Sequence, residues 1–164
     1  MRCAAAPIGE GNLARAAQLL GKTNQFNLTT RRHSAEAILK MAAEKNAFAR
    51  SFQLADKFGD NGIVGVLIAL PKEDGVLEID SFVMSCRVIG RGLENFMMAE
   101  LIAFAREHNF KHLRGVYIPT AKNAQTADFY ERLGFTPKEK SSDQSSFALD
   151  LEHAKIPETF IEKI

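Results

Sequence analysis

The sequence predicts an α/β fold in which one mixed sheet carries helices on both faces. Three strand-like runs between residues 47 and 86 are separated by short turns, which makes them antiparallel neighbours. A strong helical pattern at 93–109 lies between two strand-like runs, and this arrangement usually gives a right-handed crossover with parallel strands. A second helix and two short strands follow. The predicted order is therefore β-α-α-β-β-β-α-β-α-β-β.

The N-terminal third supplies the first strand and two helices. A run of small residues before Pro7 predicts a short strand. Asn12 is a typical N-cap residue, and the apolar face after it predicts a helix over 13–24. Ser34 predicts the start of a second helix over 35–46, with a polar loop between the two helices.

The rest of the chain alternates between apolar strand patterns and amphipathic helix patterns. Residues from Ala154 onward predict a tail or a short helix. The predicted elements are strands over 47–56, 62–71, 76–86 and 112–119, helices over 93–109 and 123–134, and a closing hairpin from 135–142 and 145–153.

Composition limits the classes of function. The chain has 164 residues, 46% of them hydrophobic and 25% charged, with a formal net charge of +1. This composition is ordinary for one globular domain, which we expect to span residues 1–164, and it gives no electrostatic argument for a nucleic-acid partner. Two distant cysteines and four scattered histidines have no zinc spacing, so we expect no metal and reduced thiols in the cytoplasm. No apolar run approaches the roughly 18 residues that a membrane span needs.

The segment CRVIGRGLENF places two glycines, one residue apart, between a strand and a helix. Glycine allows a backbone to approach a ligand closely, and a helix N-terminus presents unpaired N–H groups. Together they predict an anion site for a phosphate or diphosphate, to which Arg87 and Arg91 add charge. A P-loop is excluded because Leu93, not Lys, follows the second glycine, and a dinucleotide fingerprint is excluded because residue 95 is Asn.

A second motif about thirty residues later allows a more specific interpretation of this loop. The pattern Arg-x-x-Gly-x-Gly, followed by Asn123, Tyr130 and Gly134-Phe135, resembles the N-acetyltransferase (GNAT) superfamily over nearly the whole chain. This resemblance implies that the strands over 76–86 and 112–119 splay apart and that an acyl-CoA lies in an open V between them. It also implies that the diphosphate rests on N–H groups of residues 88–92.

The resemblance also implies roles for single residues. Tyr130 takes the place of the acid that protonates the leaving thiolate, since a phenol within hydrogen-bond reach of sulfur can donate a proton. Main-chain amides near Met84 would polarise the thioester carbonyl. The implied donor-binding residues are Val83, Met84, Cys86, Arg87, Val88, Ile89, Gly90, Arg91, Gly92, Asn123 and Tyr130.

A narrower resemblance rests on four separate strings. KTNQFNLTTRR (22–32), FGDNG (58–62), MSCRVIGRG (84–92) and YIPTAKN (117–123) resemble the C-terminal region of FkbH-like proteins. That family joins a haloacid-dehalogenase-type phosphatase module to a GNAT-like module and is implicated in loading a glyceryl group onto an acyl carrier protein toward methoxymalonyl units of polyketide pathways. The present sequence has no Asp-x-Asp motif, so it lacks the phosphatase module.

Residues on the acceptor side are predicted from composition and from position along the strand. The polar segment 22–32 suits a loop that recognises a charged group, with Lys22 and the substrate-binding candidates Asn24, Gln25, Asn27, Thr29, Arg31 and Arg32. Glu78 and Asp80 are candidates for a general base acting through water, on the face of their strand that carries Phe82, Met84 and Cys86. The Cys86 thiol is a candidate nucleophile for a covalent acyl intermediate, although a buried strand cysteine is the commoner case.

Three functions are compatible with these patterns. The first is acyl transfer from an acyl-CoA or an acyl-phosphopantetheine to an unknown acceptor. The second is a non-catalytic module that docks CoA or a carrier protein beside a separate phosphatase-like partner. The third is a structural domain that forms a homodimer.

Overall fold

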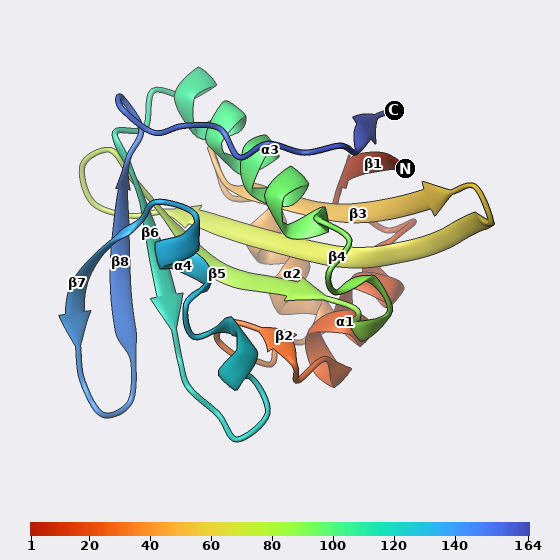
Figure 1. The fold of residues 1–164 in the computed structure, drawn as a ribbon, viewed down its shortest axis with the longest axis horizontal. Helices are drawn as coiled ribbons and strands as arrows, with labels where there is room; N and C mark the ends of the chain where they lie inside the picture. Colours follow the sequence, from red (N-terminus) through yellow and green to blue (C-terminus); the bar gives the residue numbers. More distant parts are fainter.

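The computed structural model describes residues 1–164 as one twisted sheet with helices on both faces (Figure 1). The helices are α1 (Leu13–Lys22), α2 (Ala35–Ala42), α3 (Leu93–Glu107) and α4 (Phe129–Arg132), and short 3-10 turns cover Cys86–Val88 and Ala124–Thr126. The strands are β1 (Arg2–Pro7), β2 (Phe26–Asn27), β3 (Phe48–Asp56), β4 (Gly59–Pro71), β5 (Val76–Met84), β6 (His112–Tyr117), β7 (Thr136–Lys140), β8 (Ser145–Asp150) and β9 (Glu162–Lys163).

The order of strands confirms the mixed sheet. It runs β7-β8-β6-β5-β4-β3-β1-β9, and β2 pairs with β5 off this path. Helices α3 and α4 lie on the near face in Figure 1, and α1 and α2 lie on the far face. The predicted crossover through α3 makes β5 and β6 parallel, but they pair only over Val76–Glu78 and His112–Arg114. Beyond these residues the two strands separate, which gives the expected splay.

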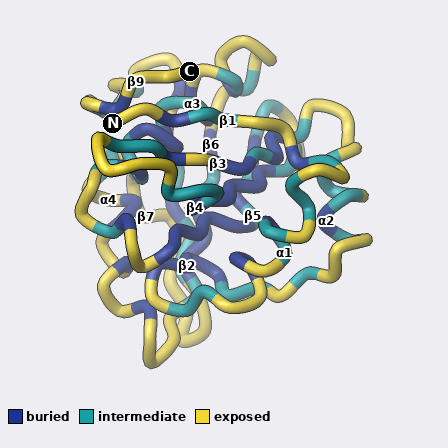
Figure 2. The backbone as a smooth tube through the Cα atoms, turned by 90° about the vertical axis from the view of Figure 1, so that its right-hand side faces the viewer, coloured by how far each residue is buried: buried dark blue, intermediate teal, exposed yellow.

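Two apolar clusters hold the layers together, one on each face of the sheet. The larger cluster joins the α3 face to Phe82 and Met84, whereas the smaller one packs α1 and α2 against Val66, Ile68 and Val83. Figure 2 shows the central strands as the most buried part of the chain, with exposed connections around them. None of the helices combines the length and the apolar character that a membrane span requires.

Several predicted elements differ from the structure in their ends. The side chain of Asn12 does not cap α1, because it bonds the Gly9 N–H and the Pro7 carbonyl in the preceding turn. Ser34 does cap α2, since its Oγ accepts from the Ala37 N–H at 3.1 Å, but that helix ends at Ala42.

The C-terminal part of the chain contains less helix than predicted. The helix expected over 123–134 is divided into a 3-10 turn and the four-residue α4. The tail after Ala154 forms no helix. It crosses beside α3 and ends in β9, which pairs in parallel with β1.

The main departure is β2, which closes the predicted open V. Residues Phe26–Thr29, here called the plug segment, run between β5 and the end of β6. Phe26 pairs with Met84 and Asn27 with Val83, while the Leu28 carbonyl accepts from the Ile118 N–H at 2.9 Å. The expectation of an open cleft between β5 and β6 is therefore wrong for this structure: main-chain groups that would face a donor there bond the protein's own backbone.

Candidate active site

The loop between β5 and α3 has the geometry of an anion site. Gly90 and Gly92 have φ of +80° and +76°, and a Cβ on either would meet open space, so glycine serves backbone conformation here rather than close packing. No protein group accepts a hydrogen bond from the N–H groups of Gly90, Gly92, Leu93, Glu94 or Asn95. The loop therefore presents donors in series at the N-terminus of α3.

The free donors lie slightly later in the chain than predicted. The N–H groups of Val88, Ile89 and Arg91 bond the carbonyls of Ser85, Cys86 and Val88, so they shape the turn instead of facing a ligand. Of the predicted span 88–92, only Gly90 and Gly92 keep free N–H groups, and the first turn of α3 supplies the rest.

The two loop arginines are held differently. Arg91 forms an ion pair with Asp56 at 2.7 Å. Hydrogen bonds from the Phe58 N–H and Asn61, and then from Arg91, hold the pKa of Asp56 below its ordinary value. Arg87 contacts only neutral oxygens of Ser85 and Asn61, both at 3.4 Å, so its charge has no carboxylate partner.

The plug segment fills the splay with apolar side chains as well as backbone. Phe26 and Leu28 are buried, and the Phe26 ring packs edge-on against Phe129 at a centroid distance of 5.5 Å. Asn123, predicted to contact the donor, instead donates from Nδ2 to the carbonyls of Asn27 at 2.9 Å and Ile118 at 3.0 Å. In this structure Asn123 anchors the plug segment.

Tyr130 is enclosed in the larger apolar cluster, where its ring packs against Phe135 and Phe147. Its ring lies flat against Gly115, where a Cβ would come within 2.4 Å of ring carbon. Its hydroxyl donates to the Val116 carbonyl at 3.4 Å, and complete burial raises the pKa of the phenol well above its ordinary value. The phenol is fully buried here, so the predicted acid role requires a rearrangement that exposes its hydroxyl to the donor.

The prediction for Glu78 and Asp80 is corrected by a β-bulge. Ile68 pairs with Ser81 and Ala69 with Ile79, so Asp80 is an extra residue on β5. The bulge reverses the side-chain alternation, and Glu78 and Asp80 do not share a face with Phe82 and Met84. They lie on the opposite side of the sheet from α3.

Asp80 belongs to a cluster that includes a residue the sequence analysis missed. Its carboxylate accepts from Arg31 at 3.0 Å and from Ser81 at 2.7 Å, and it lies 2.7 Å from His33 Nε2. Glu78 accepts from Arg114 at 3.1 Å. His33 carries no motif, because its partner is 47 residues away in the chain and only the fold joins them.

Much of the polar segment 22–32 is used to build the loop itself. Arg32 donates to the carbonyls of Leu20 and Thr23 at the end of α1 and to Asn24 Oδ1 at 2.6 Å. Asn27 bonds the Thr23 carbonyl and the Thr30 N–H, and Thr29 bonds the Asp80 carbonyl. Among the predicted substrate-binding residues, Asn27, Thr29 and Arg32 are therefore structural in this conformation, while Asn24 and Gln25 line a hollow.

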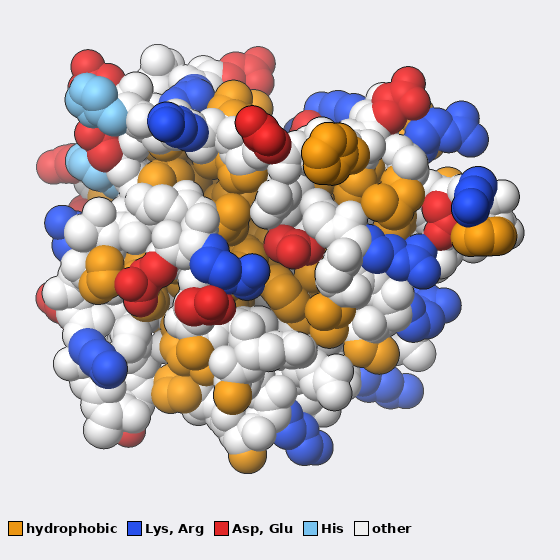
Figure 3. All heavy atoms as spheres, in the orientation of Figure 1, with side chains coloured by type: hydrophobic (Ala, Val, Ile, Leu, Met, Phe, Trp, Pro, Cys, Tyr) orange, Lys and Arg blue, Asp and Glu red, His pale blue; other side chains and the backbone are white.

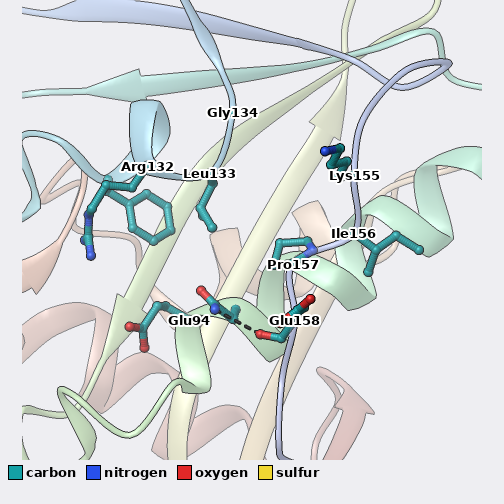
Figure 4. Close-up of a pocket in the computed structure, with 10 residues that line it drawn as sticks. Glu94, Arg132, Leu133, Gly134, Lys155, Ile156, Pro157 and Glu158 are labelled. Carbon is teal, nitrogen blue, oxygen red and sulfur yellow. Dashed lines mark hydrogen bonds between the residues drawn. The ribbon is translucent and has the colours of Figure 1, made fainter.

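Two hollows flank the plug segment on opposite faces of the sheet. The α3–α4 hollow, of about 480 Å³, is shown in Figure 4, where the C-terminal tail passes beside the first turn of α3 and Asn95 bonds the Glu158 carbonyl. One Glu94 carboxylate oxygen is buried at this turn without a hydrogen-bond partner.

The α1 hollow, of about 780 Å³, lies beside the end of α1 on the other face. Cys86 is exposed on its wall, beyond the end of β5, so it is not a buried strand cysteine. The α1 hollow is lined by Arg15, Gln18, Leu19, Lys22, Thr23, Asn24, Gln25, Ser85, Cys86, Ala121 and Lys122.

Several solved structures share this fold, and some of them are described as acetyltransferases. Ard1 from Thermoplasma volcanium matches with a TM-score of 0.74 at 14% identity, covering 92% of this chain and 98% of that one. The ribosomal-protein-S18-alanine N-acetyltransferase from Escherichia coli matches with a TM-score of 0.68 at 15% identity, covering 96% and 99%. Spermidine N-acetyltransferase from Vibrio cholerae, solved with CoA and spermine, matches with a TM-score of 0.66 at 11% identity, covering 92% and 96%. At these identities the likeness establishes the fold.

The splayed parallel strands and the loop with free main-chain N–H groups are typical of N-acyltransferase domains. The model of the acetyltransferase (GNAT) family matches residues 22–135, which is more than half of the chain. The chain belongs to the acetyltransferase (GNAT) family and is accordingly an acyltransferase whose acceptor is unknown. No curated protein sequence matches the chain significantly, and the narrower FkbH-like resemblance gains no support from these comparisons.

Proposed function

We propose that the chain transfers an acyl group from an acyl-CoA, or from another acyl-pantetheine thioester, to a nucleophilic acceptor. The observation that supports this best is the row of free N–H groups at Gly90 and Gly92–Asn95, directly after the splayed end of β5. A doubly charged diphosphate matches these donors and the nearby Arg87. The bound thioester supplies the carbonyl that an amine, hydroxyl or thiol attacks, and Tyr130 is proposed to hold the proton for the departing sulfur.

The loop fits a CoA diphosphate, but the groove does not fit the pantetheine arm while the plug segment is in place. Phe82 and Met84 lie in register with Leu28 and Phe26 of this segment, and the Phe82 carbonyl accepts from the Leu28 N–H at 3.3 Å. Donor binding therefore requires Phe26 and Leu28 to leave their buried positions. Exposing two such side chains costs roughly 1.5–3 kcal/mol each, which donor contacts must offset.

One substitution pair tests the donor site directly. Gly90→Asp and Gly90→Asn add side chains of the same shape where there is open space, and both residue types tolerate a positive φ. We expect Asp to weaken acetyl-CoA binding by at least about 100-fold through charge repulsion, and Asn by less than about tenfold. Isothermal titration calorimetry measures both. Equal binding by the two variants would refute a diphosphate at this loop.

The closed groove favours a second function, a docking module that binds CoA or a carrier protein without catalysis. In this alternative the plug segment stays in place, and a separate phosphatase-like partner performs the chemistry. The link to glyceryl or methoxymalonyl transfer on an acyl carrier protein belongs to the proposed acyl transfer, and action in the cytoplasm and a homodimer are proposed for either function. Turnover assays with acetyl-CoA and a panel of acceptors separate the two functions, because a docking module binds CoA and acylates none of them.

A further inference from the structure

The α1 hollow is surrounded by cations that have no acidic partners. Arg15, Lys22 and Lys122 line it, and no carboxylate does. The Lys22 and Lys122 ammonium groups make no hydrogen bond or ion pair with the protein, and the Arg15 guanidinium bonds only neutral oxygens of Ile63 and Gln18. Seen from the α3 side, Lys and Arg side chains gather along the edge of the molecule beside α1 and the loop after β5 (Figure 3).

A second hollow that is lined by two arginines is arranged differently. A space of about 520 Å³ over β5, β6 and β8 is lined by Arg31 and Arg114 among others. There Arg31 pairs with Asp80, and Arg114 pairs with Glu73 and Glu78. The protein neutralises both arginines at that surface, whereas no cation that lines the α1 hollow has a carboxylate partner.

Neutral donors complete the lining of the α1 hollow. Gln18, Asn24 and Gln25 contribute amide groups. The Asn24 oxygen accepts from Arg32 at 2.6 Å, and its NH₂ group donates one hydrogen to the Lys22 carbonyl at 3.4 Å, which leaves one N–H as a donor. Cations and amide donors around a space of this volume are the recognition chemistry of a small phosphorylated or carboxylated molecule.

We propose that the α1 hollow binds the anionic group of the acyl acceptor, so that the acceptor class is a phosphate- or carboxylate-bearing compound. This inference rests on the proposed acyl transfer. Lys22–Gln25 lead directly into the plug segment, and Ser85 and Cys86 directly follow the part of β5 that pairs with it. A molecule anchored there presents its free end to the groove from the face opposite α3. A polyamine acceptor would be repelled by the same lining.

Cys86 provides a readout that does not depend on catalysis. It is the exposed thiol of the chain, whereas Cys3 is buried and burial raises the pKa of the Cys3 thiol to about 12. An anionic disulfide reagent, 5,5′-dithiobis(2-nitrobenzoate), and neutral iodoacetamide should both label Cys86. We expect the ratio of their rates to fall roughly fivefold in Lys22→Gln/Lys122→Gln, because the cations attract only the anionic reagent. Lys45→Gln, at an exposed lysine outside this lining, is the matched control and should leave the ratio unchanged.

Inorganic pyrophosphate is the binding probe. It should slow iodoacetamide labelling of Cys86 in the native protein and in Gly90→Asp, which disables the neighbouring diphosphate loop, but not in Lys22→Gln/Lys122→Gln. Protection that disappears with Gly90→Asp, or a reagent ratio that the lysine substitutions do not change, would overturn the inference. A loss of affinity for CoA but not for dephospho-CoA in the lysine variant would assign the cations to the donor and also overturn it. Because these labelling measurements need no CoA, failure of the proposed acyl transfer is seen separately, as absent acetyl-CoA binding.

Discussion

The loop after β5 and the gap between β5 and β6 are adjacent parts of one expected donor site, but the loop is free to bind a ligand and the gap is filled. The loop keeps five N–H groups free and has two glycines in left-handed conformation. In the gap, Phe82–Met84 are paired with the plug segment, and Phe26 and Leu28 fill the space. One half of the site is preformed and the other half is occupied.

The difference shows where the free energy of donor binding would be used. Contacts at the loop require no rearrangement, so they can hold a diphosphate before the rest of the molecule is seated. Contacts in the gap require the plug segment to leave, and only the difference between the two sets of contacts contributes to affinity. A donor that binds only at the loop would give docking, and a donor that also displaces the plug segment would give catalysis.

The largest effect should come from locking the plug segment in place. Asn27 and Val83 face each other across β2 and β5, next to the hydrogen bond from the Leu28 N–H to the Phe82 carbonyl, which makes them a non-hydrogen-bonded pair with close side chains. In Asn27→Cys/Val83→Cys with Cys86→Ser, oxidation should abolish turnover and weaken acetyl-CoA binding by at least about 100-fold.

The same protein after reduction is the control for this lock, because it carries identical substitutions. Reduction should restore binding and turnover to the level of the unlocked variant. Equal acetyl-CoA affinity before and after reduction, measured by calorimetry, would show that the donor does not enter the gap.

Tyr130→Phe should lower kcat by about 100-fold if the phenol protonates the leaving sulfur. The lost hydrogen bond to Val116 is long, at 3.4 Å, so thermal stability should change little. Tyr117→Phe is the matched control, since the Tyr117 hydroxyl is also buried and donates to Asn123 Oδ1 at 3.2 Å. Burial raises the pKa of Tyr130 above its ordinary value of 10.0, so the phenol keeps its proton and should cause no loss of rate up to pH 10. An unchanged kcat in Tyr130→Phe would favour docking.

Phe26→Ala should loosen the plug segment. Removing this buried ring should reduce the free energy of unfolding by about 3–5 kcal/mol. Because the closed state alone loses that packing, acetyl-CoA should bind about tenfold more tightly. Phe48→Ala removes an equally buried ring that packs against Phe104, and it should reduce stability without any gain in affinity. Parallel chemical denaturation and calorimetry measure both quantities, and equal affinities in the two variants would separate the plug segment from donor binding.

The sheet and the α3 crossover could be predicted because long periodic runs determine them. The apolar pattern of β4 spans 62–71 and the stripe of α3 spans 93–105, and in both the local pattern and the tertiary packing agree. The loop glycines could also be predicted, since their conformation depends on residues close in the sequence. The N–H groups that remain free are those of Gly90 and Gly92–Asn95. Which groups remain free depends on the turn made by Cys86–Val88, and residue spacing alone does not reveal that turn.

The plug segment and the bulge could not be predicted in the same way. Two residues of strand within a polar stretch have no periodicity, and the partners of Phe26 and Asn27 are more than fifty residues away. The bulge at Asp80 leaves the composition of β5 unchanged while it reverses the faces of its side chains. Arg32 is a similar case, because a polar composition predicts ligand binding equally well whether an arginine contacts a ligand or caps α1.

The smallest effect should come from Asp56→Asn, which frees Arg91 beside the preformed loop. The Arg91–Asp56 pair is partly exposed, and exposed pairs contribute little. The pKa of Asp56 lies below its ordinary value of 3.8, so the pair stays charged at every working pH and only substitution can break it. Releasing Arg91 should tighten acetyl-CoA binding by less than about threefold and make it more sensitive to salt, because one more free cation faces the diphosphate. Calorimetry at low and high ionic strength measures this change. Weaker binding would mean that Asp56 orients Arg91 toward the diphosphate instead of competing for it. The preformed geometry of the loop would then depend on this ion pair as well as on the two glycines.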